Sequence, residues 1–233
     1  MQLNLVDCGN ALQYRFTFKS ISRRIMTRIK ICGLTRAEDV QAAANSGADA
    51  LGLVFYDKSS RNISVQQAAQ LARIIPPFIT VVGLFVNAEA NFVRAVLKHV
   101  SLDLLQFHGE ESPDFCAQFG KPYIKAIRVK SGIDLLQCAA RFHTAQGLLL
   151  DAHVEGIEGG TGKTFDWTLI PTLPLPVILS GGLQPGNVAS AIQQVRPYAV
   201  DVSSGVEITK GIKDAAKIAT FINEVNNIDL QLS

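Results

Sequence analysis

One cysteine stands where a barrel enzyme would place a reactive group. Cys32 ends the alternating apolar run Arg28–Cys32 and is followed by Gly33 and Thr35. This order is typical of a strand, a turn and a helix that Thr35 caps, with Glu38 as the partner in a capping box. In a barrel of strand–helix units, Cys32 would lie at the C-terminal tip of the first strand, where such barrels carry their chemistry. The sequence therefore makes Cys32 a candidate base, although a lone cysteine also suits a small buried hydrophobe.

Two aspartates end apolar runs in the same way. Asp151 closes the run 147–151 and is a candidate general acid, with a helix cap or a loop hydrogen bond as the alternative role. Asp201 ends the run 199–202 and is a candidate substrate contact, or it orders Ser203 and Ser204 instead.

Three late junctions are rich in glycine and favour phosphate binding. Exposed backbone N–H groups and helix N-termini bind anions, and the loops after strands seven and eight are the usual phosphate site of a (βα)8 barrel. One such junction would be weak evidence, and three in succession are much stronger, with tight turns as the alternative explanation. The candidate phosphate-binding residues are Gly160, Thr161, Gly162, Gly181, Gly182, Ser204 and Gly205.

Other polar residues near strand ends are candidates for the rest of the substrate. Arg61 can hold a carboxylate in a bidentate fork, or it is a solvated loop charge. His108 follows the fourth apolar run and is expected to line the same pocket. The segment Gly162-Lys163-Thr164 is not a nucleotide-binding loop, because position 157 is Ile157 where that pattern needs glycine.

The elements that must position these residues alternate regularly from Thr27 onward. Short β-branched runs are followed by turns and amphipathic segments, which predicts a parallel sheet of eight strands with eight helices. The number of units, and about 200 residues without a linker, favour closure into a single (βα)8 TIM barrel over an open sheet. The expected strands are 28–32, 50–55, 79–86, 102–106, 123–128, 148–151, 177–180 and 199–202. The expected helices are 35–45, 64–75, 89–99, 112–119, 132–142, one starting near 166, 185–195 and 213–225.

Composition agrees with a globular protein that is long enough to bury a sizeable core. The chain has 233 residues, 48% of them hydrophobic and 18% charged, and a net charge of +2, which gives no reason to expect nucleic acid as a partner. No apolar run is long enough to cross a bilayer. The four cysteines are widely spaced, which predicts free thiols in a reducing cytoplasm, and neither they nor the histidines show metal-ligand spacing.

The first 25 residues differ from the rest. They are basic and poor in acidic residues, and they lack both clear periodicity and a continuous apolar core. We interpret residues 1–25 as a disordered extension or as the product of an upstream start codon, with Met26 beginning a catalytic domain over 26–233. A targeting segment is the alternative.

Together these segments resemble one family, the phosphoribosylanthranilate isomerases of tryptophan biosynthesis. The similarity runs in order from Lys30 to Glu207, and only the ordered set is specific. The segments are KICGLT (30–35), GADALGLVF (47–55), KSSR (58–61), LQFHG (105–109), LLLDA (148–152), GGTGKTFDW (159–167), LSGGL (179–183) and VDVSSGVE (200–207). The arginine loop departs from the expected pattern, which has a proline before the arginine.

The resemblance implies an Amadori rearrangement without metal or organic cofactor. N-(5'-phosphoribosyl)anthranilate would become the 1-(2-carboxyphenylamino)-1-deoxyribulose phosphate. Asp151 matches the family's general acid and would protonate the ribose ring oxygen. Cys32 matches the general base and would take the proton from C2'. Arg61 matches the arginine near the anthranilate carboxylate, and the glycine-rich loops match the phosphate site.

Two other functions stay open at this point. A phosphosugar isomerase of histidine biosynthesis has the same fold, but that resemblance would place an aspartate where this chain has Cys32. A barrel that only binds a phosphorylated metabolite would keep the glycine loops and need neither Cys32 nor Asp151. The sequence leaves a monomer and a homodimer equally open.

Overall fold

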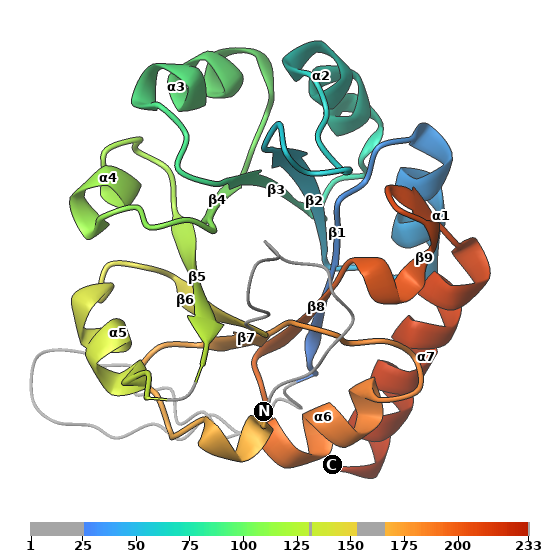
Figure 1. The fold of residues 1–233 in the computed structure, drawn as a ribbon. Coiled ribbons are helices and arrows are strands. Elements are labelled where there is room, and N and C mark those ends of the chain that lie inside the picture. Colours follow the sequence, from blue (N-terminus) through green and yellow to red (C-terminus); the bar gives the residue numbers. More distant parts are fainter. Residues whose placement is uncertain (1–25, 131, 153–165, 233) are drawn as a thin grey trace, which may run out of the picture.

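The protein is a closed barrel of eight parallel strands surrounded by helices (Figure 1). The computed structural model describes residues 26–130, 132–152 and 166–232. The barrel strands are β1 (Arg28–Cys32), β2 (Ala50–Phe55), β3 (Thr80–Phe85), β4 (Leu104–Phe107), β5 (Tyr123–Val129), β6 (Gly147–Ala152), β7 (Val177–Leu179) and β8 (Ala199–Val202). The α-helices are α1 (Ala37–Ser46), α2 (Val65–Ile74), α3 (Ala90–His99), α4 (Pro113–Ala117), α5 (Leu135–Arg141), α6 (Val188–Val195) and α7 (Ala215–Gln231). The predicted (βα)8 barrel is confirmed.

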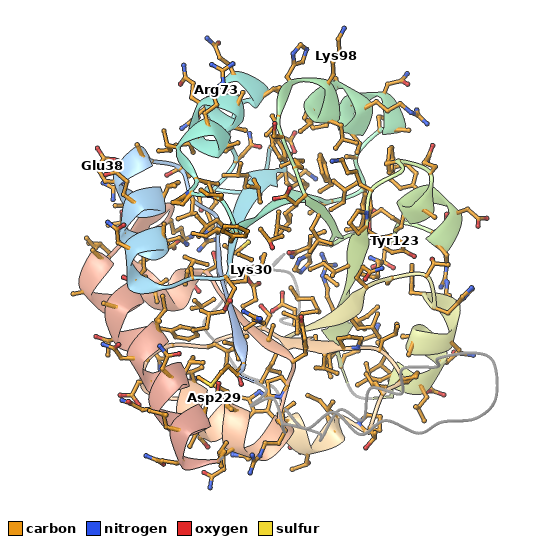
Figure 2. All side chains as sticks on the ribbon, turned by 180° about the vertical axis from the view of Figure 1, so that it is seen from behind. Lys30, Glu38, Arg73, Lys98, Tyr123 and Asp229 are labelled. Carbon is orange, nitrogen blue, oxygen red and sulfur yellow. The ribbon has the colours of Figure 1, made fainter. Side chains whose placement is uncertain are left out.

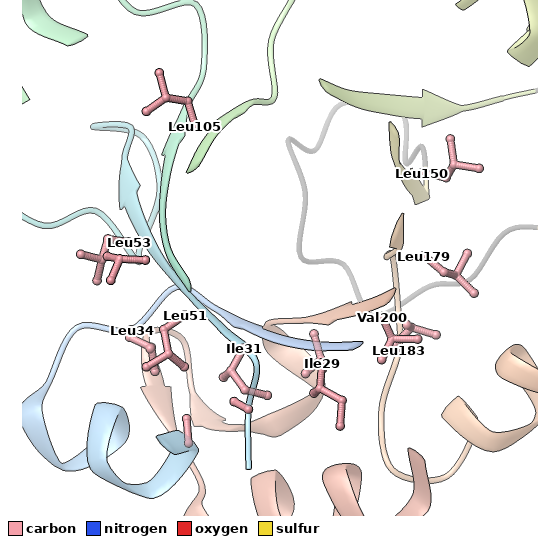
Figure 3. Close-up of a cluster of buried hydrophobic side chains, with 14 of the residues drawn as sticks. Ile29, Ile31, Leu34, Leu51, Leu53, Leu105, Leu150, Leu179, Leu183 and Val200 are labelled. Carbon is pink, nitrogen blue, oxygen red and sulfur yellow. The ribbon is translucent and has the colours of Figure 1, made fainter. Parts of the chain in front are cut away.

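The strands are apolar on both faces because both faces are buried. Ile29, Ile31 and Leu51 point outward from β1 and β2 and pack beneath the helices (Figure 3). A smaller apolar layer fills the interior at the N-terminal ends of the strands. It consists of Leu104, Ile124, Ala126, Leu149, Ile178 and Ala199. Because this layer closes the floor, polar side chains further along the strands face a cavity that opens at their C-terminal ends.

Helix ends follow local chemistry at some places and not at others. Ser64 caps α2 by accepting the N–H of Gln67, and Gly47 ends α1 in the left-handed conformation, both as expected. The expected cap at Thr35 is wrong. Helix α1 begins at Ala37 without a side-chain cap, and the Thr35 hydroxyl donates instead to the carbonyl of Gly211. A distant loop therefore takes the hydroxyl that the local pattern assigned to the helix.

The chain departs from regular alternation after β6 and after β8. Among the described residues between β6 and β7, the only helical element is a 3-10 helix, η1 (Trp167–Leu169), capped by Asp166. After β8 comes a second 3-10 helix, η2 (Ser204–Val206), and then a hairpin of β9 (Glu207–Thr209) and β10 (Ile212–Lys213). Helix α7 consequently starts at Ala215, two residues later than expected, and continues to Gln231.

Some expectations lie outside the described residues. These are the extension at 1–25 and the glycine-rich junction with Gly160, Thr161 and Gly162. Within the described part of the chain, no helix is long and apolar enough to cross a membrane.

Candidate active site

Cys32 lies at the C-terminal tip of β1, inside the mouth of the barrel. Its side chain is buried against an apolar wall formed by Val54, Leu84, Tyr56 and Val86. The neighbouring residue on β2 is Gly52, paired in register with Cys32, and a Cβ atom built at Gly52 would lie 2.8 Å from the Cys32 Sγ atom. Glycine at position 52 therefore makes room for the thiol, a role that the sequence analysis missed.

A buried ion pair lies beneath the thiol. Lys30 and Asp201 are register partners on β1 and β8, and the Lys30 Nζ atom is 2.7 Å from Asp201 Oδ1. Figure 2 shows Lys30 near the axis of the barrel, whereas Glu38, Arg73 and Lys98 lie on the outer helices. The other Asp201 oxygen accepts the Ser180 hydroxyl at 3.2 Å. Asp201 lines the cavity as expected, but its hydrogen bonds are made to Lys30 and Ser180 rather than to Ser203 or Ser204.

The thiol of Cys32 is influenced by opposing forces. Burial raises its pKa above the usual value, and the nearby carboxylate of Asp201 acts in the same direction. The ammonium groups of Lys30 and Lys213 lower it, but they do not outweigh burial. Among these groups the positive field beside Cys32 comes from lysine side chains.

Asp151 lies at the tip of β6 and contacts His108, which follows β4. His108 Nε2 is 3.1 Å from Asp151 Oδ2, and His108 Nδ1 is 3.1 Å from Gln106 Nε2. With the Gln106 amide in this orientation, Nδ1 accepts and Nε2 carries the proton directed at Asp151. The sequence expected His108 to line the pocket, and the structure adds its direct contact with the candidate acid.

The turn that carries His108 is fixed by a second buried ion pair. Glu111 accepts the backbone N–H of Gly109 at 2.9 Å and that of Asn87 at 2.8 Å. Its carboxylate is also 3.0 Å from Lys125 Nζ. Lys125 points away from the cavity, between β5 and the outer layer, so this pair supports the loop from behind.

Arg61 reaches the cavity from the loop after β2. Its Nε and Nη2 atoms donate to the two Glu207 oxygens at 2.7 and 2.8 Å, and Lys213 Nζ lies 2.9 Å from the same carboxylate. Gly33 has a φ of 79°, and a side chain there would collide with Arg61. The segment Cys32-Gly33 and the arginine loop are thus packed together. The sequence analysis did not identify Glu207 or Lys213 as partners of Arg61.

The two described glycine-rich junctions meet at the rim. Gly181 and Gly182 have φ values of 83° and 66°, and a Cβ atom on Gly205 would collide with the backbone of Leu183. The loops after β7 and β8 therefore depend on glycine for their shape and for their contact with each other. Both loops line the same cavity as Cys32 and Asp151, through Ser180, Gly181, Gly182, Leu183, Ser203 and Ser204.

The cavity brings most predicted site residues together. Cys32, Arg61, His108, Asp151 and Asp201 all line it. The sequence analysis missed Arg128, which also lines it and is the register neighbour of Asp151 on β5. In the part of the chain that the structure describes, no group of three or more histidine, cysteine or acidic side chains is arranged to hold a metal ion.

Comparisons with known proteins agree on one family. The family model for N-(5'-phosphoribosyl)anthranilate (PRA) isomerase matches residues 29–224. The N-(5'-phosphoribosyl)anthranilate isomerase of Thiobacillus denitrificans is 62% identical over 198 residues, which is 84% of this chain and 97% of that protein. The relative from Nitrosospira multiformis is 58% identical over 199 residues, 85% of this chain and 96% of that protein.

Solved structures give the same result. The crystal structure of phosphoribosyl anthranilate isomerase from Thermotoga maritima matches with a TM-score of 0.79 and 44% identity, covering 87% of this chain and all of that one. A second crystal structure, of the enzyme in complex with reduced 1-(o-carboxyphenylamino)-1-deoxyribulose 5-phosphate, matches with a TM-score of 0.75 and 40% identity over 87% of this chain and all of that one. This chain therefore belongs to the N-(5'-phosphoribosyl)anthranilate isomerase family.

Proposed function

We propose that Cys32 and Asp151 are the base and the acid of the rearrangement that defines this family. The chain is an isomerase of tryptophan biosynthesis that converts N-(5'-phosphoribosyl)anthranilate to 1-(2-carboxyphenylamino)-1-deoxy-D-ribulose 5-phosphate. The observation that carries the assignment of roles is that one cavity is lined by a thiol, a carboxyl group and two glycine-rich loops. These are the groups that a phosphorylated sugar undergoing acid–base isomerisation requires.

The acid acts first in this mechanism. Asp151 gives a proton to the ribose ring oxygen, the bond from that oxygen to C1' breaks, and a protonated Schiff base forms between C1' and the anthranilate nitrogen. His108, 3.1 Å from the Asp151 carboxylate, would orient that group through a hydrogen bond. Asp151 must carry a proton when the substrate binds.

The base acts second. The Cys32 thiolate takes the proton from C2', the electrons of that C–H bond form a double bond between C1' and C2', and the iminium nitrogen becomes neutral. The resulting enolamine tautomerises to the ketone. Cys32 acts here only as a proton acceptor, and no bond forms between its sulfur and carbon.

Binding at two ends fixes the sugar between the two groups. The loops with Gly181, Gly182, Ser204 and Gly205 would accept the phosphate, which is supported by the lining of the cavity by Gly181, Gly182 and Ser204. The junction at 160–162, which lies outside the described residues, is assigned the same role. Glu207 accepts hydrogen bonds from Nε and Nη2 of Arg61. The anthranilate carboxylate, at the end of the substrate away from the phosphate, would therefore bind the remaining Nη1 atom. Holding both ends converts proton transfer into a step within one complex, which is the entropic part of the catalysis.

The test is to separate turnover from binding. Cys32→Ala and Asp151→Ala are each expected to lower kcat by at least about a hundredfold, the usual contribution of a positioned acid or base. The reduced product analogue should still bind both variants with nearly unchanged Kd. Cys138→Ala is the matched control, because Cys138 is a free thiol on α5 outside this cavity. Near-full activity in either active-site variant would remove that residue from the mechanism.

The same experiment distinguishes an isomerase from a barrel that only binds metabolites. If the unmodified protein binds the analogue but does not convert the substrate, the non-catalytic alternative holds. If it converts the substrate and both variants lose turnover alone, the isomerase mechanism holds.

We infer further that the protein forms a homodimer through the N-terminal end of the barrel, the monomer being the alternative. A Thermotoga maritima relative is described as dimeric. On this chain, Phe78 is fully exposed at a φ of 71° beside a hollow lined by Leu104, Ile124 and Ile178. An exposed aromatic side chain next to an apolar hollow is self-complementary, as a two-fold interface requires. Phe78→Ala should lower the mass measured by light scattering to that of the monomer, and a monomeric parent protein would refute the inference.

We also infer a cytoplasmic location. The support is that Cys32, Cys116 and Cys138 are free thiols, as expected in a reducing compartment.

A further inference from the structure

Lys30 is a buried cation that the acid and the base described above do not use. It lies on β1 two residues before Cys32, so both side chains point to the inside of the barrel. Only about a twentieth of its side chain is exposed, and its ammonium is 2.7 Å from the Asp201 carboxylate. Its positive charge also lowers the pKa of the Cys32 thiol. The cation therefore acts on the candidate base while it is held by a fixed anion.

We propose that Lys30 is a positioning residue that stabilises the thiolate form of Cys32, and that Asp201 keeps the Lys30 ammonium charged and in place. This inference rests on the proposed role of Cys32 as the base. Lys30 keeps its protons throughout the reaction. When the substrate's C2'–H bond breaks, the proton goes to the Cys32 sulfur. The thiolate beside the Lys30 ammonium thereby becomes a neutral thiol.

The surroundings explain why a cation is needed there. Cys32 packs against Val54 and Leu84, an apolar wall that offers no stabilisation to a negative sulfur. Lys213, from β10, is the other lysine that acts on the thiol, but its ammonium is already bound to Glu207 and to Ser203.

The remaining charged and titratable groups that line the cavity surround the substrate space. They are Tyr56 and Arg61 from the segment after β2, His108 after β4, Arg128 on β5 and Asp151 on β6. Lys30 has the strongest influence of the two lysines on the thiol.

Asp201 has two opposite effects on this arrangement. Its charge raises the pKa of the Lys30 ammonium, which keeps the lysine protonated despite its burial. The same charge opposes a thiolate on Cys32, and it does so less strongly than the charge of Lys30 favours one. The two partners of the ion pair therefore push the ionisation of Cys32 in opposite directions.

This opposition separates an electrostatic role from a purely structural one. A buried ion pair can have a purely structural role in the barrel interior, and apolar groups of the same shape can often replace such pairs. In that case Lys30→Met and Asp201→Asn would each disturb the site through packing alone, without opposite effects on the thiol. If the proposal is right, Lys30→Met makes the Cys32 thiolate form at higher pH and Asp201→Asn makes it form at lower pH.

The experiment measures the thiolate directly and does not depend on turnover. Full-length protein is alkylated with iodoacetamide between about pH 6 and about pH 10, and the rate at Cys32 is read by peptide mass spectrometry with Cys138 as internal control. The expected order of midpoints, from highest to lowest, is Lys30→Met, the double variant, the parent protein and Asp201→Asn. The ascending limb of kcat/KM against pH should move in the same order, by about one pH unit for Lys30→Met, with most of the lost rate recovered at high pH.

Other results would overturn the proposal. Unchanged midpoints in Lys30→Met, or shifts of both single variants in the same direction, mean that the pair only supports the fold. The double variant keeps the test decisive if Lys30→Met alone leaves a buried, unpaired Asp201 and fails to fold, because it removes both charges together and must still raise the midpoint. If the midpoints shift as expected but Cys32→Ala stays active, the assignment of Cys32 as base fails while the effect of Lys30 stands.

Discussion

Gly52→Ala tests how closely the rate depends on the position of the Cys32 sulfur. The added Cβ atom would lie 2.8 Å from Cys32 Sγ and 3.2 Å from its Cα atom. Non-bonded heavy atoms normally approach to about 3.5–4.0 Å, so the sulfur must move by roughly 1 Å. Because Cys32 and Gly52 are register partners on adjacent strands, the backbone can give way only by distorting the barrel.

The expected loss of rate follows from that displacement. A misplacement of about 1 Å in a reacting group costs on the order of a hundredfold in rate. Overpacking of a dense interior costs a further 1–3 kcal/mol of stability, roughly, which lowers the melting temperature. The change should appear in kcat, because Arg61 and the loops proposed to hold the phosphate are left as they are.

The assay combines steady-state kinetics, well below the melting temperature, with thermal unfolding followed by circular dichroism. Gly186→Ala is the matched control: no atom lies within 4 Å of a Cβ atom built there, and its backbone is not in the left-handed region. The control should change neither kcat nor melting temperature appreciably. A Gly52→Ala variant with the parent kcat, or with a loss confined to KM, would refute the reasoning.

Two further predictions concern stability. Burial alone would raise the pKa of Glu207, but its hydrogen bonds to Arg61 and the charge of Lys213 outweigh burial and lower it. The stabilisation from a lowered carboxyl pKa is complete above the unfolded value of about 4.3 and is lost as the pH falls through the folded value. Glu207→Gln should therefore be less stable near neutral pH but lose less stability under acid, as measured by urea unfolding across this range; parallel curves for the two proteins would contradict this. The Asp229 carboxylate on α7 accepts the Thr27 N–H at 2.6 Å and the Thr27 hydroxyl at 2.9 Å, and so joins α7 to the start of β1. Asp229→Ala removes this acceptor. It should cost about 1–3 kcal/mol in the same assay with kcat unchanged, and a parent-like unfolding curve would show that this link is dispensable.

Much of the fold could be predicted because its signals are local. A strand such as β2 reads as an apolar run because both of its faces are buried, and Gly47 marks the end of α1 by its left-handed backbone. Thr35 shows where local reasoning failed: its hydroxyl had a second acceptor, the carbonyl of Gly211, that no pattern near residue 35 announces. The β9–β10 hairpin was missed because strands of three and two residues carry too little periodicity to be recognised.

In the candidate site, too, some residues could be predicted from local sequence and others could not. Positions at strand tips, such as Cys32 and Asp151, follow from the strand ends alone. One signal was present and unused, namely a lysine in the middle of a short strand, where Lys30 alternates with the apolar Ile29 and Ile31. An ionisable residue at such a position must have a buried partner. Its partner, however, lies 171 residues away.

The sequence by itself determined which residues stand at the tips of the strands, because hydrophobic periodicity and turn residues act over a few positions. Only the tertiary structure decided how those residues are paired. The closing contact of β1 with β8 brings Asp201 beside Lys30 and under Cys32, and the hairpin after β8 carries Glu207 to Arg61 across 146 residues. Such pairs depend on strand register and on barrel closure, and a charge at one position contains no record of where its distant partner lies. The position of Cys32 at a strand tip, and hence its candidacy as a base, could therefore be inferred from the chain, but the electrostatic setting of its thiol became visible only in the closed barrel.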